Sequence, residues 1–203
     1  MPEYSFLQMP ASLRITDLPL TYRPPVGPAA DFRITYNQRE SSQPQAFYYG
    51  NMGPKWTFDW ITWVIDDPNT VDVQADVYLR GGGREHFTDG AVHTTYPAHW
   101  RSRAVLVKVS ADPVRYERRL RDGGVEVFAQ SDGTITSGRR ILLTDVIDPQ
   151  GLTLHLTYDA NLRLVAVTDA VGQVTTLSYE LASDPFKDHE GHRSLRSICH
   201  ADV

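Results

Sequence analysis

The sequence has little cysteine, no long apolar segment and no secretory leader. Cys199 is the single cysteine among 203 residues, so no internal disulfide can form, which fits a chain made in a reducing compartment. No run reaches the ~18–20 apolar residues that a membrane helix needs. The first six residues lack a basic segment followed by an apolar core, so we predict no signal peptide. We therefore expect a protein that is cytoplasmic as made and that does not insert into membranes.

The sequence also lacks an excess of positive charge. Its 20 Lys and Arg residues stand against 25 Asp and Glu residues, which gives a net charge of −5. That balance provides no general attraction to nucleic acid, so no nucleic-acid partner is expected. One stretch is locally basic, with seven cations at Arg101, Arg103, Lys108, Arg115, Arg118, Arg119 and Arg121. Because acidic residues follow at once, we interpret these side chains as lying on the solvent-exposed faces of hairpins.

Helical periodicity is missing as well. No long stretch has apolar residues at i, i+3, i+4 and i+7. Instead, apolar and polar residues alternate in short runs that lead into glycine pairs, as in 71–79 before Gly81-Gly82-Gly83 and 115–120 before Gly123-Gly124. Glycine supplies the positive φ that tight hairpin turns need. We predict an all-β fold of consecutive antiparallel hairpins that form a curved open sheet.

A repeat of 21 residues is the most informative feature that is present. Residues 148–159 and 169–180 share the order Asp-x-x-Gly, alternating strand, Tyr and acid. In such a turn the Asp side chain can bond the backbone two residues on, and the Gly is free to adopt positive φ. The residues that we expect to shape the repeat are Asp148, Gly151, Tyr158, Asp159, Arg163, Asp169, Gly172 and Tyr179.

Residues 160–168 lie between the two copies and complete the repeat unit. They are predicted to form a second turn, with Asn161 in the left-handed position, followed by a return strand. One unit is then a two-stranded hairpin, which is marginal in water by itself. Stacked units bury a shared face, and the ring of each Tyr can cover its neighbour.

Residues 148–180 resemble the YD repeat of Rhs proteins, whose pattern is D-P-x-G, strand, Y-D, x-x-x-R-L, strand, T-D-x-x-G, strand, Y. Residues 32–40 and 53–60 resemble the opening region of the family, and residues 116–133 resemble a degenerate hairpin before the clear repeats. The resemblance implies a long protein whose repeats wind a β-sheet into a hollow shell. In family members the shell typically encloses a variable C-terminal toxin, and bacterial members serve in competition between cells. Full-length relatives are exported or associated with the cell surface.

The resemblance suggests four sections of the chain. Residues 1–30 are a lead-in with a Pro-rich loop, 31–147 are the degenerate hairpins at the start of an Rhs shell, and 148–186 hold two YD repeats. Residues 187–203 are expected to be a disordered tail without a β pattern. Permitted codons for this tail, read one nucleotide later, can spell T-D-P-F-G-R, the start of another repeat. We hypothesise that a frameshift truncates a longer repeat protein at about Lys187, which the nucleotide sequence would decide.

Several residues in the sequence have side chains of the types that often act in catalysis or metal binding. His86, His93, His99 and Asp89 lie in the hairpin region without a nucleophile motif, so we interpret them as strand and loop residues. The glycines at 81–83 lack the Lys-Ser/Thr and helix start of a phosphate loop and are read as a hairpin tip. The tail contains the one His/Cys cluster with spacing near that of zinc ligands: His189, His192, Cys199 and His200. An out-of-frame tail would give that cluster no role, so no metal or other cofactor is expected.

Four tryptophans leave a second function open. Trp56 and Trp60 share one strand face while Trp63 points to the other, and Trp100 stands apart. We expect core packing for most of them, but exposed Trp and Tyr rings also suit sugar stacking, so a carbohydrate-binding β module is the alternative. The preferred prediction is a non-catalytic scaffold, part of a YD-repeat β-shell. Its expected partners are the remainder of such a shell or another copy, which would bind the terminal edge strand, with a glycan as the alternative partner.

Overall fold

The computed structural model describes residues 2–7, 12–41, 55–70, 74–88, 94–179 and 195–200 of the chain. These residues form strands and turns without a helix, so the predicted all-β class is confirmed. The described part of the chain accordingly offers no helix that could span a membrane.

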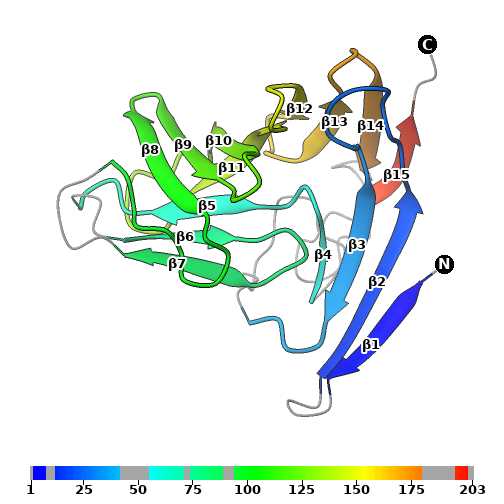
Figure 1. Cartoon of the computed structure of the whole chain (residues 1–203), viewed down its shortest axis with the longest axis horizontal. Coiled ribbons are helices and arrows are strands. Elements are labelled where there is room, and N and C mark those ends of the chain that lie inside the picture. Colours follow the sequence, from blue (N-terminus) through cyan, green and yellow to red (C-terminus); the bar gives the residue numbers. More distant parts are fainter. Residues whose placement is uncertain are drawn as a thin grey trace.

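The strands divide between two antiparallel sheets (Figure 1). The smaller sheet has the order β1 (Glu3–Leu7), β2 (Ser12–Leu20), β3 (Phe32–Asn37) and β4 (Trp56–Phe58). The larger sheet has eleven strands: β5 (Trp63–Asp66), β6 (Gln74–Tyr78), β7 (Arg84–Thr88), β8 (Val105–Ala111), β9 (Val114–Arg119), β10 (Val125–Ser131), β11 (Arg139–Ile147), β12 (Thr153–Tyr158), β13 (Leu164–Thr168), β14 (Val174–Tyr179) and β15 (Leu195–His200).

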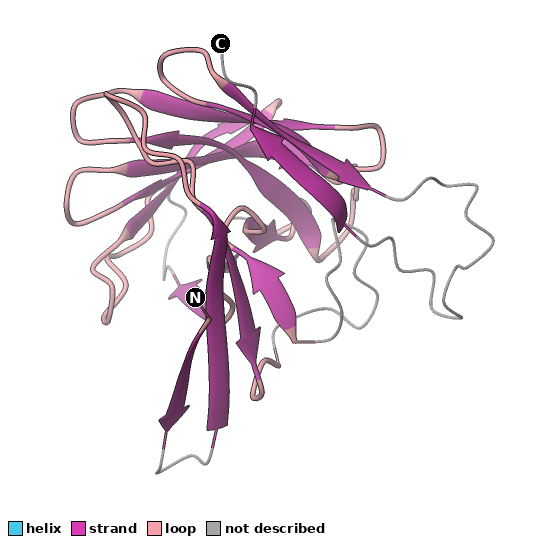
Figure 2. Ribbon diagram, turned by 90° about the vertical axis from the view of Figure 1, so that its right-hand side faces the viewer, coloured by secondary structure: helices cyan, strands magenta, loops and turns pink. Residues whose placement is uncertain are grey.

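Neighbouring strands in the large sheet follow the order of the chain from β8 to β15, and every pairing is antiparallel. This is the meander that short turns between alternating runs predict. The large sheet curls over the small one and stays open at its edges (Figure 2), as expected for a curved open sheet.

The large sheet divides at β11. One edge of β11 pairs with β10, while the other edge pairs with β5 over Arg139–Leu142 and with β12 over Asp145–Ile147. The division coincides with a register shift between β10 and β11 that leaves Thr144 unpaired in the ladder. Such bulges bend and twist a strand, so the two halves of β11 diverge into the β5–β6–β7 branch and the β12–β15 branch.

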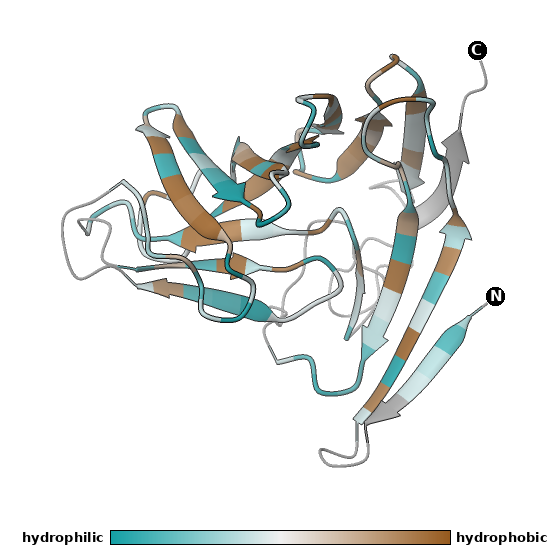
Figure 3. Ribbon diagram, viewed as in Figure 1, coloured by the Kyte–Doolittle hydropathy of each residue, from teal (hydrophilic) through white to brown (hydrophobic). Residues whose placement is uncertain are grey.

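Period-two alternation decides which side of each strand faces the core. In β12, Leu154 and Leu156 are buried, while His155 and Thr157 are exposed. The same alternation gives the banded hydropathy along β2 and β3 in Figure 3. Because successive side chains of a strand point to opposite faces, one side of the curved sheet is apolar and the other meets solvent.

The concave side of the large sheet is packed with its own side chains and with those of the small sheet. Trp63 stacks on Tyr78 with 4.3 Å between ring centroids, and both are almost fully buried. Phe32 and Phe58 of the small sheet stack at 4.8 Å and belong to the same apolar cluster as Leu154 of the repeats. The described residues of the two sheets therefore share one continuous apolar core that fills the concave side.

The aromatic run 56–65 is interrupted in the structure, which differs from the prediction that its tryptophans share one strand. Trp56 ends up in β4 of the small sheet and Trp63 in β5 of the large one, with a turn at 59–60 between them. Trp60 and Trp63 are both buried in the common core. The apolar side chains on both sides of this turn pack into the same core. Residues 56–65 therefore contribute one strand to each sheet.

Part of the tail also differs from the expectation of disorder. Leu195–His200 forms β15 and pairs with β14, while 187–194 and 201–203 lie outside the described residues. The pairing of Tyr179 with Leu195 and of Leu177 with Ile198 repeats the pairing of Tyr158 with Leu164 and of Leu156 with Val167. The backbone of β15 thus occupies the position of a further return strand. The frameshift itself stays a prediction.

The expected boundary at residue 30 falls inside the small sheet, between the paired strands β2 and β3. The Pro-rich loop that joins them also touches the repeats. A Cβ atom placed on Gly27 would lie 2.7 Å from Cβ of Ala170 and 3.5 Å from Cβ of Leu152. The lead-in is therefore packed directly against the turns of the YD segment.

Candidate functional site

Five hairpin turns share one geometry and form the recurring feature of the molecule. They span residues 79–83, 120–124, 148–152, 159–163 and 169–173. In each turn the first N–H donates to the fifth carbonyl at 2.8–3.0 Å, and the fourth N–H donates to the first carbonyl at 2.9–3.1 Å. The fourth residue always has positive φ, between 60° and 94°. The same five-residue turn therefore connects degenerate and regular hairpins alike.

An aspartate opens each of the three turns in the YD segment. Oδ1 of Asp148, Asp159 and Asp169 accepts hydrogen bonds from the third and fifth N–H of its turn at 2.8–2.9 Å. These bonds provide an acceptor for the N–H groups of the third and fifth residues, which the two backbone–backbone bonds of the turn do not use. The aspartates and the glycines Gly151 and Gly172 thus have complementary parts in one turn.

The two earlier turns begin with leucine and therefore lack the aspartate at the first position. In each of them the carboxylate of another residue accepts the N–H of the fifth residue instead. In the turn that begins at Leu120, Oδ1 of Asp122 accepts from the N–H of Gly124 at 3.0 Å. In the turn that begins at Leu79, Oε2 of Glu40 accepts from the N–H of Gly83 at 2.8 Å. Glu40 follows β3, so its side chain connects the small sheet to the β6–β7 hairpin. Sequence reasoning missed this role, because 43 residues separate the donor from the acceptor.

The prediction that Asn161 takes the left-handed position is wrong. Leu162, the fourth residue of its turn, has φ of 60°. Asn161 is the third residue, and its N–H donates to Asp159. The turn fixes which position needs positive φ, and that requirement outweighs the local preference of Asn over Leu.

We expect Gly151→Ala to lower the free energy of unfolding by about 1–2 kcal/mol, the usual cost of a left-handed non-glycine residue. Gly151 has φ of 87°, and an added Cβ would meet no atom within 4 Å, so only backbone strain contributes. Urea unfolding checks the value. Gln150→Ala at the exposed neighbouring position is the control and should change stability little; equal losses in the two variants would contradict the shared turn geometry.

A buried tyrosine hydroxyl closes each repeat against the strand before it. Tyr158 donates to the carbonyl of Leu143 at 2.5 Å, and Tyr179 donates to the carbonyl of Leu164 at 2.8 Å. In both cases 15 residues separate the donor from the acceptor, so the bond recurs with the period of the sequence. Burial raises the pKa of both tyrosines, which keeps each hydroxyl protonated as a donor.

Arg163 connects one turn to the tyrosine of the following strand. Its Nε donates to Oδ2 of Asp159 at 2.7 Å, and its guanidinium carbon lies 5.0 Å from the ring centroid of Tyr179. Partial burial alone would raise the pKa of Asp159, but hydrogen bonds from Arg163 and from backbone N–H groups outweigh it and lower the pKa. The Y-D and R positions of the repeat are therefore parts of one interaction.

The lowered pKa of Asp159 predicts a pH-dependent contribution to stability. A carboxyl group with a depressed folded-state pKa stabilises the fold above its ordinary value of 3.8, and the contribution is lost as pH falls through the folded-state value. We expect Asp159→Asn to remove that part of the acid sensitivity. Thermal unfolding at a series of pH values below 6 measures it. Asp148→Asn, in a turn whose fifth residue is Leu152, is the matched control and should retain more of the acid sensitivity.

A buried ionic cluster lies between β7, β9 and β10. Arg118 donates from Nε and Nη2 to Oε2 of Glu85 at 3.1 and 2.9 Å, and from Nη1 to Oε2 of Glu126 at 2.7 Å. Arg80 Nε lies 3.1 Å from Oε1 of Glu126, and His99 Nδ1 lies 3.5 Å from Oε1 of Glu85. Burial alone would lower the pKa of Arg118, but the charges of Glu126 and Glu85 outweigh it and raise the pKa.

The cluster corrects one part of the sequence interpretation. Arg118 does not lie on a solvent-exposed hairpin face, since only 9% of its side chain is exposed. Its neighbour Arg119 does, with 55% of its side chain exposed beside Glu117. Alternation in β9 sends adjacent arginines to opposite sides of the sheet, and the basic composition of the stretch concealed this difference.

The histidines do not converge on a common point within the described residues. His86 is exposed and pairs through Nδ1 with Asp76 on the neighbouring strand, whereas His99 lies beside Glu85 and Ser102. His93 and Asp89 lie outside the described residues, as do His189, His192 and the side chains of Cys199 and His200. The glycines 81–83 lie in the β6–β7 turn, as the sequence predicts. Among the described residues, no group of three or more His, Cys, Asp or Glu side chains could hold a metal ion.

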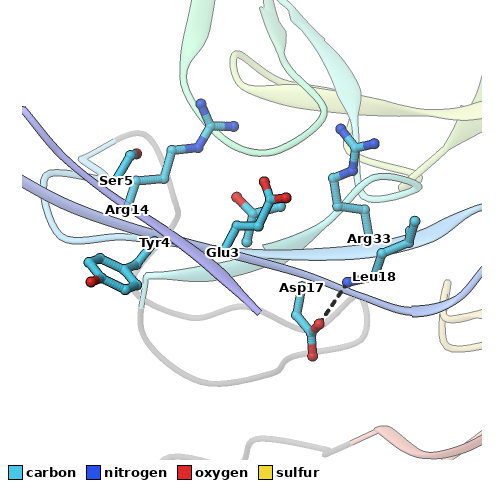
Figure 4. Close-up of a pocket in the computed structure, with 8 residues that line it drawn as sticks. Glu3, Tyr4, Ser5, Arg14, Asp17, Leu18 and Arg33 are labelled. Carbon is cyan, nitrogen blue, oxygen red and sulfur yellow. Dashed lines mark hydrogen bonds between the residues drawn. The ribbon is translucent and has the colours of Figure 1, made fainter. Parts of the chain in front are cut away.

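An open groove lies along β1, β2 and β3 and has a volume of about 580 Å³. Arg14 and Arg33 point to one side of these strands, and Tyr4 and Asp17 point to the other (Figure 4). The carboxylate of Asp17 accepts the N–H of Leu18 at 3.0 Å. The charged side chains are divided between the two sides of the strands, with Glu3, Arg14 and Arg33 on one side and Asp17 on the other.

The recurring turns, the tyrosine bonds and the strand order define a class of protein, a β-hairpin repeat protein whose units bury a shared face. The RHS Repeat family model matches residues 142–174 and 158–182. The match supports the assignment of this segment to the RHS repeats of the Rhs/YD-repeat family. No curated protein matches the chain.

Proposed function

We propose that the chain is a non-catalytic structural scaffold, a wall section of an Rhs/YD-repeat shell. The observation that carries the proposal is the recurrence, at 21 residues, of both the turn and the tyrosine–carbonyl bond. Each strand of a repeat unit pairs with the strand before it. The residues at the fixed positions of the repeat form the turns and the tyrosine–carbonyl bonds that hold this pairing. In full-length relatives such a wall would enclose a C-terminal toxin used in competition between bacteria.

The filled concave side of the large sheet supports a position for this section at the closed end of a shell. The small sheet covers the interior of the large one, and aromatic side chains fill the space between them. A cargo would then lie beyond β15, against later units, and this section would form a closed end. Among the described residues, His86, His99 and the glycines 81–83 have structural contacts that account for them without a reaction.

The proposal requires that the wall can be continued at β15. One edge of β15 pairs with β14, and the described residues place no strand on its other edge. Unpaired edges bind further strands, so we expect concentration-dependent self-association that uses this edge. Sedimentation velocity over a range of concentrations measures it.

Two adjacent proline variants distinguish the two edges of β15. N–H groups alternate in direction along the regular part of β15, so one of Cys199→Pro and His200→Pro removes an outward donor and the other removes a bond to β14. The outward variant should abolish association and leave the melting temperature nearly unchanged. Ile135→Lys, on an exposed loop, is the control. Association that persists in both proline variants, or a wild-type chain that stays monomeric at all concentrations, would contradict the proposal.

A further inference from the structure

The loop before β8 closes around the side chain of His99. The N–H of His99 donates to the carbonyl of Ala104 at 2.8 Å, and the N–H of Arg103 donates to the carbonyl of His99 at 2.9 Å. Only 10% of the His99 side chain is exposed, and its ring centroid lies 5.6 Å from that of Phe87 on β7. Trp100 is 73% exposed, and its ring centroid lies 5.9 Å from that of His99. His99 therefore joins an exposed loop to the interior of the large sheet.

Nδ1 of His99 faces two residues that require opposite protonation states. The backbone nitrogen of Ser102 lies 3.4 Å from Nδ1, and the hydroxyl oxygen of Ser102 lies 3.3 Å from it. Oε1 of Glu85 lies 3.5 Å from the same Nδ1. A backbone N–H can only donate, so it needs the lone pair of an unprotonated Nδ1, whereas a carboxylate oxygen can only accept and needs a proton there. One nitrogen cannot satisfy both partners at once.

Glu85 connects His99 to the buried ionic cluster. Oε2 of Glu85 accepts two hydrogen bonds from Arg118 of β9, while Oε1 is the oxygen that faces His99. Glu126 of β10 and Arg80 of the β6–β7 turn continue the cluster beyond Arg118. The charged groups that act on the ring are thus Glu85 directly and the other three through it. A proton on Nδ1 would let Oε1 of Glu85 accept a hydrogen bond from His99.

The contact with Ser102 helps to hold a strained turn. Arg103 has φ of 61°, and a left-handed conformation of this kind persists only where neighbouring contacts hold it. The hydroxyl of Ser102 accepts the N–H of Ala104 at 3.2 Å while it also faces Nδ1 of His99. Loss of the contact between Ser102 and His99 would therefore remove one of the bonds that keep the turn closed.

We propose that His99 is a pH-sensitive switch for this loop. At neutral pH the unprotonated Nδ1 accepts the N–H of Ser102, and the loop is closed. When the pH falls, Nδ1 takes up a proton and donates to Glu85, so the N–H of Ser102 loses its acceptor. The turn at Arg103 then opens, and Trp100 leaves its fixed position. This device is additional to the scaffold role, which does not require it.

Nuclear magnetic resonance of the chain between about pH 8 and pH 5 tests the proposal, because histidine side chains change charge in this range. The ring signals of His99 and the amide signal of Ser102 should shift with the same midpoint. Hydrogen exchange at the N–H groups of Ser102 and Arg103, corrected for its ordinary pH dependence, should become about tenfold faster at the acidic end. That factor is what the loss of one hydrogen bond predicts.

Two histidine variants assign the effect. His99→Gln provides an amide oxygen that can accept but does not titrate, so the amide of Ser102 should show no pH transition. His86→Gln is the matched control, because His86 is exposed and pairs with Asp76, and this variant should leave the transition unchanged. The coincidence of the two wild-type midpoints tests the proposal even where His99→Gln is unstable.

Four outcomes would overturn the proposal. Exchange at Ser102 that stays constant over this pH range would show that the loop does not open, and a His99 ring that does not titrate there would remove the switch. A transition that persists in His99→Gln, or one that is lost in His86→Gln, would assign the effect to another group. None of these results involves the recurring turns, so the scaffold role is tested separately.

Discussion

Replacing Arg118 with alanine should lower the free energy of unfolding by about 3–5 kcal/mol, the largest effect that we expect of any single substitution in the chain. Glu85 and Glu126 are buried and depend on the guanidinium of Arg118 for three hydrogen bonds. Without it, two carboxylates would remain in a poorly solvated place, and Arg80 and His99 reach only one oxygen each. Denaturant unfolding followed by tryptophan fluorescence measures the loss.

Two variants separate this explanation from a general sensitivity of β9. Arg119→Ala removes an exposed cation next to Arg118 and should change stability by about 0.5 kcal/mol or less. Arg118→Lys keeps the charge but cannot bridge both carboxylates, so its loss should be intermediate. A loss in Arg119→Ala as large as that in Arg118→Ala would show that the buried cluster is not the cause.

Replacing Leu156 with alanine should cost about 2–5 kcal/mol, because it removes a buried side chain from the shared face of the repeats. Leu156 is 2% exposed, and Leu177 has the same place in the next repeat with 4% exposed. The packing account therefore predicts losses in the same range for Leu177→Ala. Both are measured as differences in the free energy of unfolding.

The neighbouring position provides the control for this prediction. Thr157 follows Leu156 on β12 and faces solvent. Thr157→Ala should cost about 1 kcal/mol or less, which reflects strand preference alone. Similar losses at Leu156 and Thr157 would mean that the face assigned to the core is wrong.

Local rules were sufficient to predict the repeat segment of the fold. Asp and Gly at fixed positions specify a turn, and alternation specifies a strand with one buried face, so the strands and turns of 148–179 could be predicted, apart from the left-handed position at Leu162. The all-β class of the rest of the chain was predicted from glycine turns between alternating runs, at Gly81–Gly83 and Gly123–Gly124. The family resemblance, confirmed over 142–182, depended on these positions as well.

Contacts between distant residues could not be read in this way. Nothing near Glu40 indicates that its carboxylate bonds the N–H of Gly83. The division of the sheet at β11 depends on β5, which lies more than 70 residues earlier in the chain. Arg118 and Arg119 look alike in the sequence, and only the position of Glu85 on another hairpin decides which of them is buried. Such features arise from tertiary packing, which outweighs local preference.

The most direct test of the account is an experimental structure in which residues 148–158 and 169–179 are superimposed. We predict the same five-residue turn in both, positive φ at Gly151 and Gly172, and hydroxyls of Tyr158 and Tyr179 bonded to the carbonyls of Leu143 and Leu164. Unlike backbones in the two segments, or tyrosine hydroxyls that point into solvent, would contradict the claim that each repeat is built on the one before it.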